Sequence, residues 1–127
     1  MPKQNAPSPT DAELAILNVL WRRGPSTVRQ VREELGTTSG YTTTLKLLQI
    51  MTDKGLVLRD ESQVSHVYRA RHSAERTQRR IVRDLIDRAF GGSARKLVMQ
   101  ALAATPTSHE ELAEIRKLLD ELEGETP

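Results

Sequence analysis

The sequence has 127 residues, of which 37% are hydrophobic and 28% charged, a composition that fits one globular domain with at most a short appendage. It has no cysteine, which excludes disulfides, thiolate metal sites and cysteine nucleophiles, and no apolar run approaches the ~20 residues that span a bilayer. The formal net charge is only +2, and the N-terminus lacks the apolar stretch of a signal peptide, so we expect a cytoplasmic protein without membrane insertion.

The first part of the chain predicts a flexible N-terminal arm and two helices. Residues 1–9 are polar and proline-rich, which is typical of a loose arm. A capping box at Thr10 and Glu13, in which each side chain binds an otherwise unpaired backbone N–H, begins a helix that Gly24-Pro25 ends. A second capping box, at Thr27 and Gln30, begins a shorter helix. The expected buried stripes are Leu14, Leu17, Leu20 and Trp21 in the first helix, and Val28, Val31 and Leu35 in the second.

A third helix and a β-hairpin are predicted next. The polar segment Thr37–Gly40 is turn-like, and a helix should run from about Tyr41 to Lys54, where Gly55 stops it. Its expected buried positions are Leu45, Leu48 and Met51. Residues 56–59 and 64–71 are apolar or alternating, with turn-like residues 60–63 between them, so they predict two strands of a hairpin.

Three further helices are predicted after Ser73. The first carries a wide apolar stripe and ends at Gly91-Gly92, and the second is marked by apolar residues between Leu97 and Leu102. The third begins at a capping box, Ser108 with Glu111. Its apolar residues follow a short coiled-coil spacing: Leu112, Ile115, Leu119 and Leu122.

This order predicts a mainly α fold with a small β-hairpin: a winged helix-turn-helix DNA-binding domain over residues 10–72, then a helical dimerisation domain over residues 73–124. In such a domain the third helix enters the DNA major groove. The exposed face of that helix carries side chains that suit base edges and phosphates: Tyr41, Thr42, Thr43, Lys46 and Gln49. Residues 1–72 are also more basic than acidic, whereas residues 108–127 are acidic. Double-stranded DNA is therefore the expected partner.

Several segments of the chain follow one another in a specific order and spacing. They are Glu13–Leu17 with Leu20-Trp21, then Pro25–Val31, Tyr41–Leu45 and Lys54–Val57, and downstream Ala89–Ser93 with Leu97-Val98. In this order they resemble the BlaI/MecI/CopY penicillinase repressor family of winged helix-turn-helix regulators, over about residues 8–123. The resemblance implies a sequence-specific transcriptional repressor that binds a pseudo-palindromic operator as a homodimer.

The expected DNA contacts come from three places. Some match the family's recognition-helix motif, some begin the second helix, where backbone N–H groups favour phosphate, and some lie in or near the wing. The ten residues are Thr27, Arg29, Tyr41, Thr42, Thr43, Lys46, Lys54, Arg59, Ser65 and His66. Each wing residue could equally be a solvated strand residue, and Arg69 and Arg71 could instead support the wing.

The later helices carry more apolar surface than a winged domain of this size needs, which favours a homodimer over packing within one chain. The expected interface residues are Ile81, Leu85, Ile86, Phe90, Leu112, Ile115, Leu119 and Leu122.

Two mechanisms are known to inactivate repressors of this family, and this sequence excludes one of them. Metal sensing through C-terminal cysteines is excluded, and His66, His72 and His109 have no metal-site spacing, so neither a metal nor a cofactor is expected. In the BlaI and MecI branch, a membrane-bound sensor protease triggers cleavage within the fifth helix. The aligned position here is Gln100-Ala101, although the family's Asn-Phe pair is absent.

Enzymatic activity is not expected, because the sequence has no Gly-rich phosphate loop, nucleophile elbow or HExxH motif. Two alternatives to an operator-binding repressor stay open. One is a winged-helix module that binds a protein. The other is a ligand-responsive regulator of the MarR type, although the sequence gives no sign of a ligand cavity.

Overall fold

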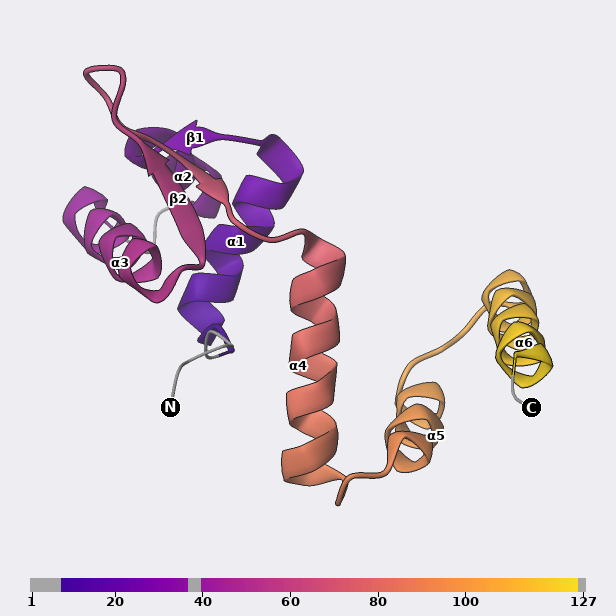
Figure 1. Cartoon of the computed structure of the whole chain (residues 1–127). Helices are drawn as coiled ribbons and strands as arrows, with labels where there is room; N and C mark the ends of the chain where they lie inside the picture. The colour runs from indigo at the N-terminus through magenta and orange to yellow at the C-terminus, as the bar shows by residue number, and fades with distance from the viewer. Residues whose placement is uncertain (1–7, 37–39, 126–127) are drawn as a thin grey trace. The chain divides into compact units, whose positions relative to one another are not determined.

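The computed structural model describes residues 8–36 and 40–125 (Figure 1). The expected fold class is confirmed, with helices throughout and one small sheet. The elements are α1 (Asp11–Arg23), β1 (Ser26–Thr27), α2 (Val28–Leu35), α3 (Tyr41–Lys54), β2 (Val57–Asp60), β3 (Val67–Ala70), α4 (Ala74–Ala89), α5 (Ala94–Ala104) and α6 (His109–Gly124). Most of the predicted arm, residues 1–7, and most of the predicted polar turn, residues 37–39, lie outside the described residues.

The three predicted capping boxes are present. At the start of α1, Thr10 Oγ1 accepts from the Glu13 N–H at 3.2 Å, and Glu13 Oε1 accepts from the Thr10 N–H at 2.9 Å. Thr27 with Gln30 and Ser108 with Glu111 make the same reciprocal pair at α2 and α6. Each box satisfies backbone donors that a helix cannot satisfy internally, and this is why the sequence marks these three helix starts so clearly.

The wing contains one more strand than the sequence predicted. The expected hairpin forms, with Arg59 opposite Tyr68 and Asp60 opposite Val67. Its bounds differ from the prediction: Asp60, expected in the turn, ends β2, and residues 64–66, expected in the second strand, lie in the loop. In addition, Ser26 and Thr27 pair antiparallel with Tyr68 and Val67, so the strand order is β1-β3-β2. The sequence predicted Thr27 as a helix cap and a DNA contact, but not as a strand residue. Because β1 has two residues, it leaves no alternation pattern from which a strand could be read.

The core of the first unit is aliphatic around one aromatic ring. Its most deeply buried apolar side chains come from α1, α2, α3 and the sheet: Ile16, Val31, Leu48, Met51, Val57 and Tyr68. All three predicted stripes need correction. In α2, Leu35 is half-buried, and only Val28 and Val31 are buried. In α3 the third buried position is Thr44, and Leu45 is only half-buried; in α1, Ile16 and Val19 are buried whereas Leu14 and Trp21 are half-buried. Thr44 tolerates burial because its hydroxyl donates to Gly40 O at 3.0 Å.

The chain divides into two compact units between Asp84 and Leu85, within α4. The sequence placed the domain boundary after residue 72, where strand gives way to helix. Two hydrogen bonds attach α4 and the segment before it to the rest of the winged unit. Trp21 Nε1 donates to His72 O at 3.0 Å, and the Ser8 hydroxyl donates to Asp84 Oδ2 at 2.9 Å.

The helices of the second unit bury almost nothing in a single chain. Neither α5 nor α6 has a buried residue. The side chains of Val98, Met99, Leu118, Leu119 and Leu122 are between 44% and 60% exposed. Isolated helices of this length are marginal in water, so these two helices need a surface that covers their apolar sides.

A buried ion pair joins the start of α1 to the end of α3. The Glu13 side chain is 2% exposed, and Lys54 Nζ lies 2.7 Å from its Oε2. Burial raises the pKa of the Glu13 carboxyl, but hydrogen bonds from the Lys54 ammonium and the Thr10 N–H outweigh burial. The net pKa is below its ordinary value of 4.5. Ionised Glu13 therefore stabilises the fold above pH 4.5, and this contribution is lost as the pH falls from there through the folded-state pKa.

We predict that Glu13→Gln lowers the free energy of unfolding at pH 7 by about 1–3 kcal/mol, because it removes the charge that Lys54 and the α1 N-terminus bind. Below pH 4.5 the difference from wild type should shrink, since the wild-type carboxyl becomes neutral as well. Urea unfolding of both proteins at pH 7 and at successively lower pH measures this difference. A difference that does not change with pH would contradict the assigned role.

Candidate nucleic-acid interface

A surface hollow of ≈ 520 Å³ lies where α2, α3 and the wing meet. Six of the ten residues expected to contact DNA line it: Thr27, Arg29, Tyr41, Arg59, Ser65 and His66. The remaining lining residues are Val28, Leu45, Gln49, Val64 and Tyr68. The structure thus brings together residues that are up to about forty positions apart in the sequence.

The α2 side of the hollow is a capped helix N-terminus. Thr27 serves both as the N-cap of α2 and as a strand residue paired with Val67. Arg29 is exposed in the first turn of α2, which contains no acidic residue. The partial positive charge of a helix N-terminus and a guanidinium together favour an anion such as a phosphate.

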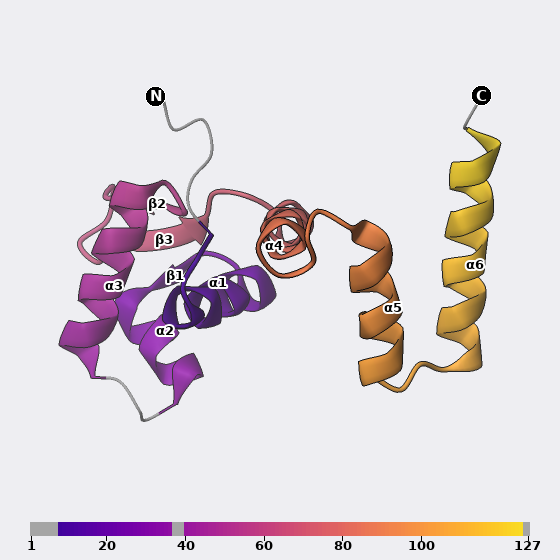
Figure 2. The ribbon, with the colours of Figure 1, turned by 90° about the horizontal axis from the view of Figure 1, so that it is seen from below.

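The α3 side presents an exposed polar face. In both views α3 lies at one edge of the winged unit (Figures 1 and 2). Thr42, Thr43 and Lys46 are exposed next to the hollow's Tyr41, which is 50% exposed. Thr44, Leu48 and Met51, on the opposite side of α3, are buried. This burial fixes the helix rotation, so the polar side chains point outward as the 3.6-residue period requires.

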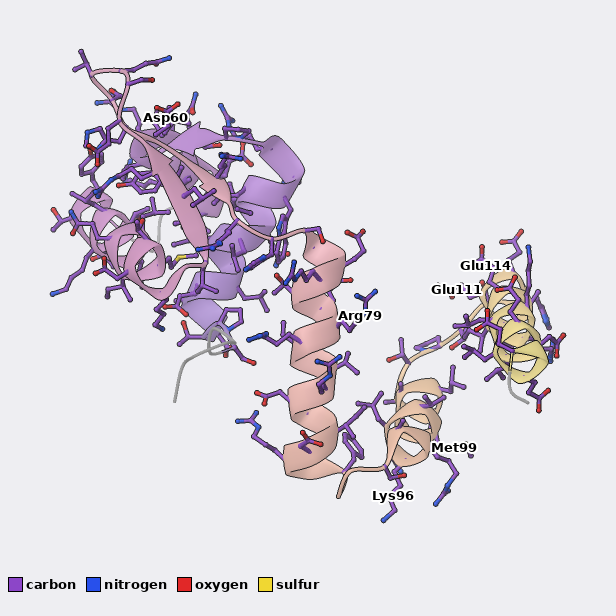
Figure 3. The ribbon with its side chains drawn as sticks, in the orientation of Figure 1. Asp60, Arg79, Lys96, Met99, Glu111 and Glu114 are labelled. Atoms are coloured by element: carbon purple, nitrogen blue, oxygen red, sulfur yellow. The ribbon has the colours of Figure 1, made fainter. Side chains whose placement is uncertain are left out.

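The wing side is shaped by a short turn. The Ser62 N–H donates to Asp60 Oδ1 at 2.9 Å, and this hydrogen bond holds the pKa of Asp60 below its ordinary value. Figure 3 shows Asp60 at the base of the loop that projects from the sheet. Arg59 Nε lies 2.7 Å from Glu61 Oε2, which orients the guanidinium beside the hollow. Ser65 and His66 are exposed in the same loop.

Four lining residues belong neither to the predicted contacts nor to the predicted exposed face of α3: Val28, Leu45, Val64 and Tyr68. Val64 is fully exposed although it is apolar, and Leu45 and Tyr68 contribute to the floor of the hollow. Val64 carries a signal that could have been read: it is an apolar residue at the end of an otherwise polar turn. Gln49 is eight residues, or about two helical turns, after Tyr41. The two side chains therefore lie on the same face of α3, and both line the hollow.

Four of the ten predicted contacts do not line the hollow: Thr42, Thr43, Lys46 and Lys54. The first three are exposed on α3, whereas Lys54 is bound elsewhere. It lies at the C-terminal end of α3, and its ammonium binds the buried carboxylate of Glu13. The backbone N–H of Arg71 donates to Leu56 O at 3.0 Å, a bond that does not depend on the basic side chain. Basic character alone could not distinguish Lys54 from the residues that line the hollow.

The histidines do not form a metal site. Among residues 8–36 and 40–125, no group of three or more His, Asp or Glu side chains could hold a metal ion. Burial lowers the pKa of His72, and the neighbouring charges of Arg76, Arg71 and Arg80 lower it further. In the same part of the chain, no helix is both long and apolar enough to cross a membrane.

Comparison with known proteins places this chain in a family. Residues 9–121 match the penicillinase repressor family. The chain is 31% identical over 117 residues to the transcriptional regulator BlaI of Mycobacterium tuberculosis, strain CDC 1551 / Oshkosh, and to that of strain ATCC 25618 / H37Rv; each alignment covers 90% of this chain and 84% of the relative. This chain belongs to the penicillinase repressor family.

The fold agrees with a solved transcriptional regulator. Tm0710 from Thermotoga maritima matches with a TM-score of 0.50 and 19% identity, over 91% of this chain and 74% of that chain. This penicillinase repressor family member is therefore a winged-helix transcriptional regulator rather than an enzyme. The hollow lies on the winged unit by which such a regulator reads DNA.

Lys46 and Lys54 of this repressor-family protein form a matched pair on one helix, and we predict opposite effects. Lys46→Met should reduce the slope of log binding constant against log salt on a mixed-sequence DNA duplex by about 0.9, without lowering the thermal midpoint. Lys54→Met should lower the thermal midpoint, because it leaves Glu13 buried without its cation, but keep the wild-type slope.

Fluorescence anisotropy at several salt concentrations and differential scanning calorimetry measure these two quantities. A reduced slope for Lys54→Met with an unchanged slope for Lys46→Met would reverse the two assignments.

Proposed function

We propose that this protein represses transcription by binding a two-fold symmetric DNA operator as a homodimer. One observation carries the proposal: the hollow brings together the N-terminus of α2, two arginines, and Tyr41 and Gln49 from the exposed polar face of α3. The major groove admits an α-helix, and the phosphate backbone beside it attracts cations and helix N-termini. In this arrangement α3 enters the groove, while α2 and the wing contact the flanking strands.

The side chains fall into two groups: some suit phosphates and would position the protein on DNA, and others suit base edges and would read the sequence. Arg29 and Arg59 carry charge and would bind phosphates, which fix the register without selecting a sequence. Thr42, Thr43 and Gln49 are exposed on α3 and offer hydroxyls, methyl groups and an amide, which suit thymine methyls and adenine edges. Lys46 is exposed on the same face and can reach either a base edge or a phosphate.

Homodimer formation is supported by the uncovered helices of the second unit. Of the predicted interface residues, Leu85, Leu119 and Leu122 are 38%, 53% and 52% exposed in one chain. The other five, Ile81, Ile86, Phe90, Leu112 and Ile115, are partly exposed. A second copy would cover the same patch on both chains, which is the arrangement of a two-fold interface. Two-fold protein symmetry then requires inverted half-sites in the operator.

Release from DNA by proteolysis stays a prediction for this chain. Gln100 and Ala101 lie within α5, and both are exposed in the single chain. A cut between them would separate α6 from the remainder of the polypeptide, and would thereby remove half of the predicted interface. A membrane-bound sensor protease would be the upstream partner in that scheme.

We predict that wild-type protein selects inverted repeats from a random duplex library, with half-site centres about 10 base pairs or a multiple of that apart. On a selected duplex, Thr42→Ala and Thr43→Ala should each weaken binding by about 1–3 kcal/mol, because base contacts are lost. Binding to mixed-sequence DNA should change little. Gel-shift titration of both duplexes measures the difference.

Asn18→Ala is the control, since Asn18 is an exposed polar residue on α1 that does not line the hollow. Failure to enrich any sequence, together with binding to a protein that ignores salt, would favour the protein-interaction alternative over operator binding.

We predict that Leu119→Asp weakens the dimer by on the order of 2–4 kcal/mol, because a carboxylate would be buried in the interface. Ala113→Asp introduces the same charge on the exposed opposite side of α6 and should leave the dimer intact. Sedimentation velocity over a concentration series separates the two variants. Equal dissociation constants for both would show that this side of α6 is not the interface.

A further inference from the structure

One face of α4 is left uncovered by the winged unit. Thr77 is the buried residue of α4, and Asp84, two turns later, accepts from Ser8, so these two residues mark the covered side. At 100° per residue, Arg79 lies about 200° round the helix from Thr77, near the opposite side. Val82, one turn beyond Arg79, is 41% exposed. Within residues 8–36 and 40–125, Arg79 is exposed and makes no hydrogen bond or ion pair, and Figure 3 shows it projecting from α4.

The second unit has a hollow whose apolar and acidic lining suits an arginine side chain. It measures ≈ 450 Å³ and lies between the end of α5 and the side of α6. Its apolar lining includes Leu102, Pro106, Ile115 and Leu118, and two carboxylates, Glu111 and Glu114, stand at the same place. Figure 3 labels both glutamates on α6. Glu111 Oε1 already accepts from the Ser108 N–H at 3.0 Å, whereas Glu114 has no partner in the part of the chain that the structure describes.

The charges of the two helices are complementary. α4 carries five arginines against three acidic residues, and α6 carries six acidic residues against two basic ones. Each helix also has exposed apolar side chains beside those charges, Val82 on α4 and Leu118 on α6. An arginine suits such a hollow, because its methylene stem packs on apolar surface while its guanidinium binds a carboxylate.

Building on the proposed homodimer, we propose that α6 of one subunit packs across the uncovered face of its partner's α4, with Glu114 bound to the partner subunit's Arg79. The apolar hollow holds the arginine stem, and Leu118 covers the partner subunit's Val82. Because the dimer axis repeats this contact, each dimer contains it twice. The occupant of the hollow is therefore a second copy of this chain, and the pair sets the register of one subunit on the other.

Exchange of the two charges tests this contact. Arg79→Glu alone places two acids together in both copies of the contact, and Glu114→Lys alone places two bases together. Each variant should therefore dissociate at about ten-fold higher concentration or more. A one-to-one mixture of the two variants restores an opposite-charge pair at both copies and should form heterodimers with nearly the wild-type dissociation constant.

Asp120→Lys is the control, since it makes the same charge change as Glu114→Lys on the other side of α6 from the hollow and should not require a complementary partner. Analytical ultracentrifugation, with one variant fluorescently labelled, measures homodimers and heterodimers, and circular dichroism checks folding. Dimers that are equally stable in both variants, or variants that stay monomeric when mixed, would overturn the contact. A wild-type protein that is itself monomeric would instead overturn the proposed homodimer.

Discussion

The pairing of β1 with β3 is the constraint on which the proposed DNA-binding side of this protein depends. Ser26 and Thr27 are one short connection beyond α1, and Thr27 is also the residue that caps α2. Their ladder with Tyr68 and Val67 therefore anchors the helix-turn-helix directly to the wing. The backbone of Tyr68 pairs with Ser26, and its side chain is buried in the hydrophobic core. Without the ladder, the wing would be a two-stranded hairpin, which is marginally stable on its own.

The sequence predicted those features whose cause is local. Capping boxes, glycine stops and helical spacing depend on a few neighbouring residues, and for this reason the starts of α1, α2 and α6 were correctly predicted. The expected polar face of α3 also agrees with the exposure of Thr42, Thr43 and Lys46, because helical period alone decides which side can be buried.

Features that depend on distant partners could not be predicted in the same way. Thr44 can occupy a core position in place of Leu45 because Gly40 O accepts its hydroxyl, and hydropathy does not register that hydrogen bond. Lys54 looked like one more basic residue beside the wing, but the carboxylate it binds is forty-one positions earlier in the chain. Similarly, the hollow needs three elements in their final arrangement, whereas a sequence shows them only one after another.

The attachment of α4 to the winged unit has a consequence for the kind of operator that the proposed dimer can accept. Trp21 holds the chain at His72, just before α4, and Ser8 holds α4 at Asp84, so residues 74–84 of α4 belong to the winged unit. In the proposed dimer, any adjustment to a longer or shorter spacer between half-sites would occur after Asp84, where the second unit begins. Tolerance of spacer length would thus depend on the last five residues of α4, and not on the residues proposed to read the bases.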